Sequence, residues 1–261
     1  MSTKITLTLD EQVATIAFNR PALLNALDEE MILGFRAHCE ALLDDAGVRC
    51  VVLRGEGAAF LAGGDVGMFA HRLEELPAAS LRLAREMHFG VLALRRMPKP
   101  VLASVHGAVA GAGLSLMMAC DLAIAADDTR FSAAYSRIGA SPDGGGTFFL
   151  ARQLGTRKAL ELALLSEPID AAGALALGLV NRVVPAAVLR AQTQALARRL
   201  AAGPTLAYAE TKRLIDAAVD NSLEQQLEAE AQAFSRCARS DDLREGVRAF
   251  IEKREAVFHG R

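Results

Sequence analysis

Two loops rich in glycine and alanine are the part of this sequence best suited to bind a polar group. The first covers residues 60–66 (FLAGGDV); the second covers residues 106–113 (HGAVAGAG) and opens directly into a helix expected over 114–120. Missing side chains let backbone N–H groups approach a ligand closely, and a helix N-terminus adds unpaired donors and partial positive charge. Two such loops can aim two N–H groups at one oxygen, as an oxyanion hole requires.

Tight packing of strands against helices is the simpler explanation for either loop taken alone. Neither loop has the spacing of a dinucleotide-binding GxGxxG motif or of a phosphate-binding GxxxxGK[ST] motif. The four cysteines lie far apart, without CxxC spacing or a cluster of histidines, at Cys39, Cys50, Cys120 and Cys237. Metal ligation therefore has little support, and we expect reduced thiols.

The composition excludes several classes of protein. The chain has 261 residues, 52% hydrophobic, so it can bury a large core and is not a low-complexity disordered chain. Its 29 basic and 31 acidic residues give a net charge of −2, which argues against binding to nucleic acid or to an anionic membrane. The longest apolar run, 101–119, is interrupted by His106 and three glycines and predicts a strand and a helix, not a membrane span. The N-terminus lacks a signal-peptide pattern, so we expect a cytoplasmic protein.

The elements that must position the loops are short strands that alternate with helices. Residues 4–9 and 13–18 alternate in polarity around a turn and predict a β-hairpin. Asp28 is a good N-cap for a helix to about residue 45. A further helix is expected over 80–96, before Pro98 and Pro100, and strands over 50–53, 101–105 and 122–126. Helices then begin near residues 145, 156, 170, 185, 204 and 222, and a last one covers 241–257.

This order of elements predicts an α/β fold with a helical C-terminal layer. We expect a core over residues 1–203, which holds both loops, and a helical region over 204–261. The charged residues after Ser222 are expected to form a solvated or subunit-facing surface, and Glu210, Lys212 and Arg213 are expected to be similarly ordinary helix charges without a role in the site. The helices of this region also carry apolar faces, formed by Leu206, Leu214, Ile215, Leu223, Leu227, Phe234 and Phe250.

Short motifs follow one another along almost the whole chain. They are NRP at 19–21, NAL at 25–27, FLAGGD at 60–65, PKP at 98–100, HG at 106–107, CD at 120–121, GASPDGGGT at 139–147 and REGVRAFIEKR at 244–254. Together they resemble the enoyl-CoA hydratase/isomerase (crotonase) family. The resemblance implies a spiral core of repeated ββα units and C-terminal helices that pack trimers, often paired into hexamers. It also implies an acyl-CoA thioester as substrate, with coenzyme A as part of the substrate and no separate cofactor.

The resemblance assigns roles to residues of both loops. The amides of Gly64 and Ala112 correspond to the two oxyanion donors, which polarise the thioester carbonyl and stabilise an enolate. Relatives hold the adenine and pantetheine arm of coenzyme A, mainly through backbone groups, at positions that correspond to Leu61, Ala62, Asp65 and Val66. The tail of a neighbouring subunit touches the nucleotide at positions that correspond to Phe250 and Lys253.

The chain departs from the family pattern where common hydratases have two glutamates. Ser115 and Tyr135 occupy those positions here, and we expect both to line the acyl site. Hydration of a double bond needs an activated water and a proton donor, usually both carboxylates. A serine without a partner is a poor base, and a tyrosine stays protonated near neutral pH. We therefore expect little ordinary hydratase activity.

One carboxylate, Asp143, remains near the implied acyl site. It precedes the glycines that begin an expected helix, so a simple capping role is an alternative. Its context over 136–147 is most similar to ring-epoxide and oxepin-CoA isomerases of the phenylacetate pathway, which place an aspartate there. His88 matches the general base of 4-chlorobenzoyl-CoA dehalogenases, or else it is an ordinary helix histidine. His71 is expected in the pocket wall or at the surface.

The sequence thus predicts an acyl-CoA isomerase that moves a double bond, or rearranges a ring-derived acyl group, through a thioester enolate. Asp143 would take a proton from one carbon and return it to another. Two alternatives stay open. One is a dehalogenase-like aryl-CoA hydrolase with Asp143 as nucleophile and His88 as base, and the other is a catalytically weak acyl-CoA-binding protein. The expected assembly is a homotrimer or a hexamer.

Overall fold

A six-stranded sheet forms the centre of the molecule, for which a computed structural model describes residues 3–70 and 73–261. The strand order is β1-β2-β3-β4-β6-β9. β1 and β2 form the predicted antiparallel hairpin, and the other neighbours run parallel. The strands are β1 (Ile5–Asp10), β2 (Val13–Phe18), β3 (Cys50–Gly55), β4 (Val101–Val105), β6 (Leu122–Ala126) and β9 (Arg182–Val184).

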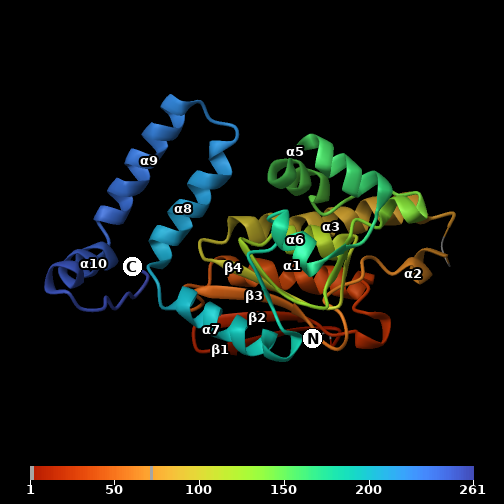
Figure 1. Ribbon diagram of the computed structural model, residues 1–261, viewed down its shortest axis with the longest axis horizontal. Helices are drawn as coiled ribbons and strands as arrows, with labels where there is room; N and C mark the ends of the chain where they lie inside the picture. Colours follow the sequence, from red (N-terminus) through yellow and green to blue (C-terminus); the bar gives the residue numbers. More distant parts are fainter. Residues whose placement is uncertain (1–2, 71–72) are drawn as a thin grey trace.

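Helices cover both faces of this sheet (Figure 1). They are α1 (Glu29–Leu43) and α3 (Leu76–Arg96) on one face and α7 (Leu189–Ala201) on the other. Val51 of β3 packs in the core on the α1 and α3 side, whereas its neighbour Val52 packs on the α7 side. Strands buried on both faces read as continuous apolar runs, which is why the sequence predicts β3 and β4 without an alternating pattern.

A second, three-stranded sheet contains β5 (Ala108–Ala110), β7 (Arg130–Ser132) and β8 (Ile169–Asp170). The buried helix α4 (Ala112–Met118) follows β5 almost at once. The second loop leads into a helix as predicted, but residues 108–110 within it form a strand, and the helix begins at Ala112 and not at 114. The strand partners of β5 lie far away in the sequence, so its local pattern does not reveal it.

The remaining short elements connect these layers. Asp28 caps α1 as predicted, and its carboxylate accepts the N–H of Met31 at 3.0 Å. Gly155 interrupts α5 with non-helical angles, a φ of 74° and a ψ of 161°, so the helix starts predicted near 145 and 156 correspond to the two helical parts of α5. The elements are α2 (Val66–Ala70), α5 (Gly146–Leu165), α6 (Ala171–Ala176) and the 3-10 turns η1 (Pro21–Leu23), η2 (Tyr135–Ile138) and η3 (Ala186–Val188). Within residues 3–70 and 73–261, no helix is both long enough and apolar enough to cross a membrane.

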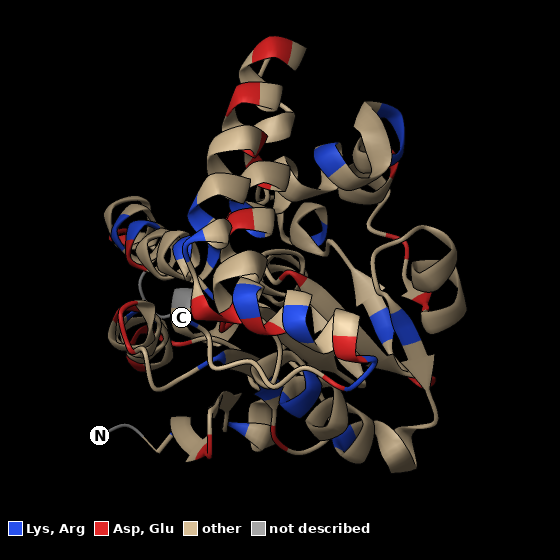
Figure 2. Cartoon of the chain, turned by 90° about the vertical axis from the view of Figure 1, so that its left-hand side faces the viewer, with Lys and Arg blue, Asp and Glu red and all other residues tan. Residues whose placement is uncertain are grey.

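Three helices, which we call the C-terminal arm, extend from the core (Figure 1). They are α8 (Thr205–Ala218), α9 (Leu223–Ala238) and α10 (Asp241–Glu252). Figure 2 shows charges of both signs interspersed along helices of the molecule. The last helix ends at Glu252 and not near 257, because the chain turns back there: the carboxylate of Asp242 accepts the N–H groups of His259 and Gly260 at 2.6 and 2.8 Å.

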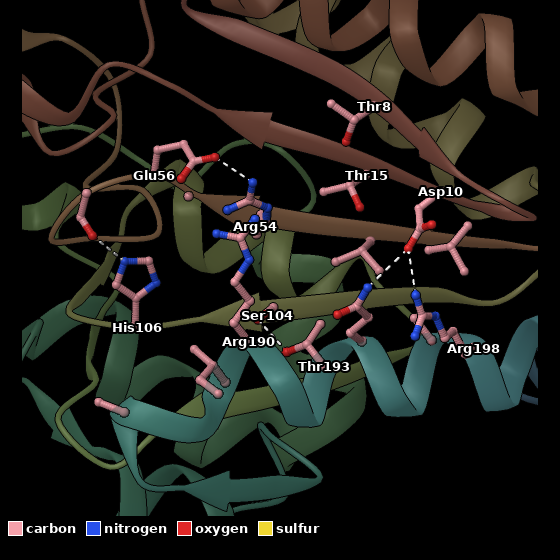
Figure 3. Close-up of a pocket in the computed structure, with 18 of the residues that line it drawn as sticks. Thr8, Asp10, Thr15, Arg54, Glu56, Ser104, His106, Arg190, Thr193 and Arg198 are labelled. Atoms are coloured by element: carbon pink, nitrogen blue, oxygen red, sulfur yellow. Dashed lines mark hydrogen bonds and ion pairs between the residues drawn. The ribbon is translucent and has the colours of Figure 1, made fainter.

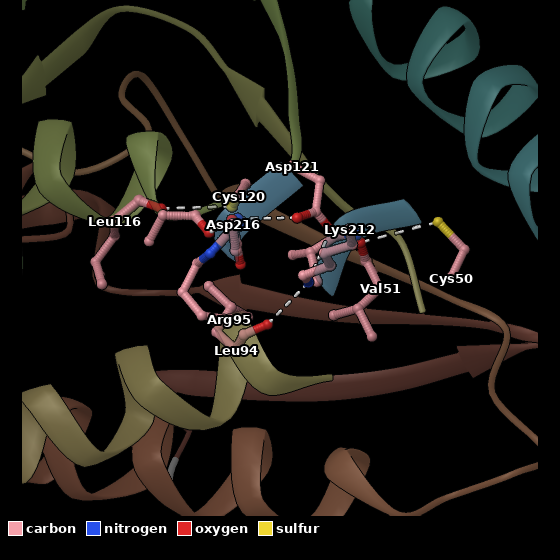
Figure 4. A network of polar contacts seen from close by, with 11 residues as sticks. Cys50, Val51, Leu94, Arg95, Leu116, Cys120, Asp121, Lys212 and Asp216 are labelled. Carbon is pink, nitrogen blue, oxygen red and sulfur yellow. Dashed lines mark hydrogen bonds and ion pairs between the residues drawn. The ribbon is translucent and has the colours of Figure 1, made fainter. Parts of the chain in front are cut away.

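A buried polar network fastens the arm to the core (Figure 4). The carboxylate of Asp121 lies 2.9 Å from Arg95 and 2.9 Å from Lys212 of α8, and it accepts the N–H of Val101 at 2.8 Å. The side chain of Lys212 is only 10% exposed, and burial lowers its pKa. The expectation of an ordinary helix charge at Lys212 is therefore wrong, because this lysine neutralises a carboxylate beneath the arm.

Candidate active site

The two glycine-rich loops lie against each other. The N–H of Leu61 donates to the carbonyl of Ala108 at 3.2 Å, and its carbonyl accepts the N–H of Ala110 at 3.0 Å. Further along, a Cβ built on Gly111 would lie 3.5 Å from the Cα of Gly63. Both of these glycines have positive φ, 53° and 111°, a conformation that favours glycine. The loops therefore meet at the residues directly before the two predicted oxyanion donors.

The amides of Gly64 and Ala112 follow this contact. Neither donates a hydrogen bond to an acceptor in the part of the chain that the structure describes. The next amide, that of Asp65, does have a partner, the carbonyl of Leu27 at 2.9 Å. Buried backbone N–H groups are nearly always paired, so the unpaired amide of the buried Ala112 is suited to receive an acceptor from a ligand, and the amide of the exposed Gly64 lies next to the same loop contact.

An ion pair shapes the first loop. Arg20 lies 2.7 Å from Oδ2 of Asp65, and this hydrogen bond lowers the pKa of the carboxyl group. Leu61 is fully buried and its backbone pairs with β5, so it supports the loop from inside. Ala62 is half-buried and Val66 is 50% exposed, so both are accessible from outside. The sequence did not reveal the Arg20–Asp65 pair because its members are far apart in the chain.

Tyr135 and Asp143 come together beside the loops. The hydroxyl of Tyr135 donates to Oδ1 of Asp143 at 2.5 Å. The same ring reaches the contact between the loops, because a Cβ built on Gly111 would lie 3.9 Å from its Cζ atom. Burial and the charge of Asp143 raise the pKa of Tyr135, which keeps the phenol protonated as a donor. The phenol thus connects the carboxylate to the glycine loops.

The helix-capping alternative for Asp143 is wrong. Gly145 is the N-cap residue of α5, and no side chain caps that end of the helix. Asp143 contributes only its backbone carbonyl, which accepts the N–H of Gly146 at 2.9 Å. Its carboxylate bonds to Tyr135 instead. The sequence pattern suggested a cap because aspartate is common before helices, but the phenol lies eight residues earlier in a separate turn.

Ser115 and His88 contact the same segment from two further helices. The hydroxyl of Ser115, in α4, donates to the backbone carbonyl of Asp143 at 2.8 Å. His88, in α3, accepts the N–H of Gly144 through Nε2 at 3.1 Å. A ring nitrogen that accepts a hydrogen bond carries no proton, so the lone pair of Nε2 is engaged by the backbone. Four predicted site residues therefore form one cluster, composed of His88, Ser115, Tyr135 and Asp143.

Two other predicted residues lie apart from this cluster. Phe250, in α10, is 85% exposed, and Lys253 follows at the end of that helix. α10 lies at the opposite end of the molecule from α2, which directly follows the first loop (Figure 1). Phe250 and Lys253 therefore lie far from the first loop of the same chain. His71 lies outside the described residues.

A cavity of about 420 Å³ lies elsewhere, between α7 and the outer face of the large sheet (Figure 3). Its polar side chains largely bind one another. Asp10 lies 3.1 Å from Arg198, and the hydroxyls of Ser104 and Thr193 are 2.7 Å apart. None of the predicted site residues lines this cavity. This cavity is therefore separate from the cluster of predicted site residues at the glycine loops.

Comparisons with known proteins identify the family of this chain. A sequence model of the family described as "Enoyl-CoA hydratase/isomerase" matches residues 8–261. A "Probable enoyl-CoA hydratase" of Rhodobacter capsulatus is 39% identical over 97% of this chain and 96% of its own. A "1,2-epoxyphenylacetyl-CoA isomerase" of Escherichia coli is 36% identical over 97% of each chain. The crystal structure of an enoyl-CoA hydratase from a Polaromonas species matches with a TM-score of 0.93 at 36% identity, over 98% of this chain and 99% of that chain. This chain therefore belongs to the enoyl-CoA hydratase/isomerase (crotonase) family and has its fold.

Proposed function

We propose that this member of the enoyl-CoA hydratase/isomerase family is an acyl-CoA isomerase. It moves a double bond, or rearranges a ring-derived acyl group, through a thioester enolate. The observation that carries the proposal is the place of Asp143, whose carboxylate is bonded to Tyr135 beside the contact of the two glycine loops. Ser115 and Tyr135 add no carboxylate to the cluster. A reaction that needs a single carboxylate base fits this set of side chains.

In the proposed reaction, the thioester oxygen of a 3-enoyl-CoA accepts hydrogen bonds from the amides of Gly64 and Ala112. The carboxylate of Asp143 removes a proton from C2, and the electron pair moves onto the thioester oxygen as a dienolate. The protonated Asp143 then gives this proton to C4, while the electrons return to form the C2–C3 double bond. The product is a 2-enoyl-CoA, and Asp143 is again a carboxylate.

Typical contributions of oxyanion donors and of one acid–base group to the reaction rate are large enough for this small set of groups to catalyse the isomerisation. One oxyanion donor typically stabilises the transition state by about 2.7–4 kcal/mol. A general acid–base group typically accelerates a reaction by about 10²–10⁴-fold. A single carboxylate can act first as base and then as acid, because the proton that it removes is the proton that it returns. A second acid–base group becomes necessary when water must also be added.

Hydration of a 2-enoyl-CoA is the second candidate function, because a relative named as a hydratase is at least as similar as the named isomerase. We favour isomerisation because of the hydrogen bonds that Ser115 and Tyr135 make at the two usual acid–base positions. The Ser115 hydroxyl donates to the carbonyl of Asp143, and the Tyr135 hydroxyl donates to its carboxylate. Neither group is therefore placed as a base for an attacking water.

Two other reactions suggested by the sequence remain outcomes of the test. Hydrolysis of an aryl-CoA with Asp143 as nucleophile needs His88 as a base, but Nε2 of His88 is engaged by the amide of Gly144. That hydrogen bond would have to break before the ring could accept a proton. A catalytically weak acyl-CoA-binding protein would use the two loops without turnover.

The proposal includes a second copy of the chain. Coenzyme A lies along residues 61–66, and Phe250 and Lys253 of a neighbouring copy contact its nucleotide end. The arm supports this arrangement with side chains more than half exposed, namely Ile215, Val219, Leu223, Leu227, Phe234, Phe250 and Ile251. A large apolar surface on one chain marks a protein contact. A homotrimer, alone or paired as a hexamer, would cover it.

The direct test compares three substrates on one preparation of the protein: a 3-enoyl-CoA, crotonyl-CoA and 4-chlorobenzoyl-CoA. Formation of the conjugated 2-enoyl product from the first should be the fastest reaction. Faster hydration of crotonyl-CoA would replace the isomerase by a hydratase. Chloride release from the third substrate would favour hydrolysis, and tight binding without turnover would favour a binding protein.

A further inference from the structure

The segment that carries Asp143 has no regular structure of its own. It follows η2 and precedes α5, and its next two residues, Gly144 and Gly145, have φ angles of 60° and 83°. Such a turn leaves the carboxylate without support from a helix or strand. A base must nevertheless be held near the productive geometry, because a misplacement of about 1 Å can reduce the rate by about 100-fold.

Ser115 supports this turn through its backbone. Its side chain is 1% exposed, and its hydroxyl donates to the carbonyl of Asp143 at 2.8 Å. The turn packs closely on this serine: a Cβ built on Gly146 would lie 2.6 Å from the serine Oγ, and one built on Gly144 would lie 3.1 Å from its Cβ. The space beyond Ser115 is therefore occupied by the turn. Ser115 therefore supports the Asp143 turn, besides replacing the glutamate that common hydratases have at this position.

The two oxygens of the Asp143 carboxylate differ in their contacts, because Tyr135 bonds to only one of them. Oδ1 of Asp143 accepts the phenol hydrogen bond at 2.5 Å. Oδ2 accepts no hydrogen bond from the described residues, within which every buried side-chain oxygen and nitrogen atom has a partner. Oδ2 is therefore not fully buried. One oxygen is held by the protein and the other is available to a ligand.

His88 supports the turn from a third element. Its Nε2 atom accepts the N–H of Gly144 at 3.1 Å, one residue after the carboxylate. The three supporting side chains come from α3, α4 and η2, and each makes one hydrogen bond to residues 143–144. These contacts come from three directions, so together they restrict the turn more than any one of them alone.

We propose that Ser115, Tyr135 and His88 are positioning residues, which hold the Asp143 turn so that Oδ2 alone takes and returns the proton. This inference rests on the proposed isomerase function and adds to it. It assigns the same task, support of the Asp143 turn, to Ser115 and Tyr135 at the usual acid–base positions and to His88. His88 then acts through its lone pair as a hydrogen-bond acceptor and never as a base.

A matched pair of variants tests the role of His88. In His88→Gln the amide oxygen can replace Nε2 as acceptor for the Gly144 N–H, whereas His88→Leu removes the acceptor. We expect His88→Leu to lower the isomerase kcat by about 10–100-fold with little change in KM, and His88→Gln to recover most of it. Equal loss in both variants would show that the histidine acts as a base and would overturn this part.

Tyr135→Phe and Ser115→Ala test the other two contacts. In Tyr135→Phe the carboxylate of Asp143 loses the hydrogen bond that holds Oδ1, so this variant should lower kcat with little change in KM. Ser115→Ala removes the hydrogen bond to the backbone carbonyl of Asp143, so it should also lower kcat with little change in KM. Among the described residues, the titratable groups bonded to 143–144 are Tyr135 of η2 and His88 of α3.

Controls separate a local effect from general damage. Tyr208→Phe and Ser104→Ala remove the same atoms away from the cluster and should leave kcat unchanged. Asp143→Asn separates this inference from the proposed function. If Asp143→Asn isomerises as fast as the wild type, the proposed function fails. If Asp143→Asn is inactive while Tyr135→Phe, Ser115→Ala and His88→Leu keep the wild-type kcat, only the positioning proposal is overturned.

Discussion

The hydroxyl of Tyr135 and the carboxylate of Asp143 are joined by a hydrogen bond of 2.5 Å beside the contact of two glycine-rich loops. Burial and the charge of Asp143 raise the pKa of the phenol, so it remains a donor through the neutral range. Proton transfer is thereby left to the carboxylate. The same bond explains why Asp143 does not cap α5, whose N-cap is Gly145.

Hydration should be weak in this protein. We expect crotonyl-CoA turnover about 100-fold or more below that of an enzyme with two glutamates, because each general acid–base group typically contributes about 10²–10⁴-fold. Ser115→Glu should not restore it: the turn at Gly144 and Gly146 already contacts Ser115, so a larger side chain displaces Asp143. Hydration assays of the wild type and Ser115→Glu provide the measurement. A large gain of hydration in the variant would contradict this packing argument.

The conformation of Gly63 should control the oxyanion site. Its φ is 111°, and an added Cβ would lie 3.4 Å from the carbonyl oxygen of Ala110. Gly63→Ala should therefore strain the loop by about 1–3 kcal/mol and displace the amide of Gly64, with a fall in kcat by about 10-fold or more. Gly178→Ala is the control, since its φ is 74° and nothing lies within 4 Å. It should lose stability and keep kcat, and an equal loss of kcat in both variants would argue against a local effect.

The fold was predictable where the signal is local. The β1–β2 hairpin follows from alternating residues around a turn, and the start of α1 follows from the capping residue Asp28. β5 was not predictable, because its partners are β7 and Leu61, which lie elsewhere in the chain. The burial of Lys212 was not predictable for the same reason, because its carboxylate partner, Asp121, lies in a different layer.

The network below the arm should contribute measurably to stability. Lys212→Met removes one of the cationic partners of Asp121, and Arg95 remains. We expect a loss of about 1.5–3 kcal/mol in the free energy of unfolding, the range for hydrogen bonds to charged groups. Lys158→Met, which breaks an exposed pair with Glu161, should cost at most about 1 kcal/mol. Denaturant unfolding measures both losses of free energy. Equal losses would mean that the Lys212–Asp121 pair stabilises the fold no more than an exposed pair does.

The exposed apolar side chains of the arm should lie in a subunit contact. Light scattering at micromolar concentration should show a homotrimer or a hexamer. Phe234 is 69% exposed in a single chain, so Phe234→Asp should shift the protein toward smaller species if a second copy covers it. Leu9→Asp, at a 61% exposed position on β1, is the control and should leave the mass unchanged. A wild-type monomer would contradict the expected assembly.

The candidate site was only partly predictable. The two loops stand out because glycine and alanine are unusual at such density, and their contact at Gly63 and Gly111 is present in the structure. The partner of the Asp143 carboxylate could not be inferred, because aspartate before a helix favours a cap in local sequence terms. The hydrogen bond from Gly144 to His88 joins residues 56 positions apart, and no spacing rule connects them.

Asp143→Asn tests the central claim most directly. Asparagine keeps the size of the side chain and removes the base. The measurement is the maximal rate at which the variant and the wild type isomerise a 3-enoyl-CoA, with the affinity for the 2-enoyl-CoA product and the thermal midpoint as controls for binding and folding. We predict that the maximal rate falls by about 100-fold or more, with affinity and midpoint close to the wild type. Wild-type turnover in Asp143→Asn would contradict the proposed role of this carboxylate, because the proton would then be carried by another group.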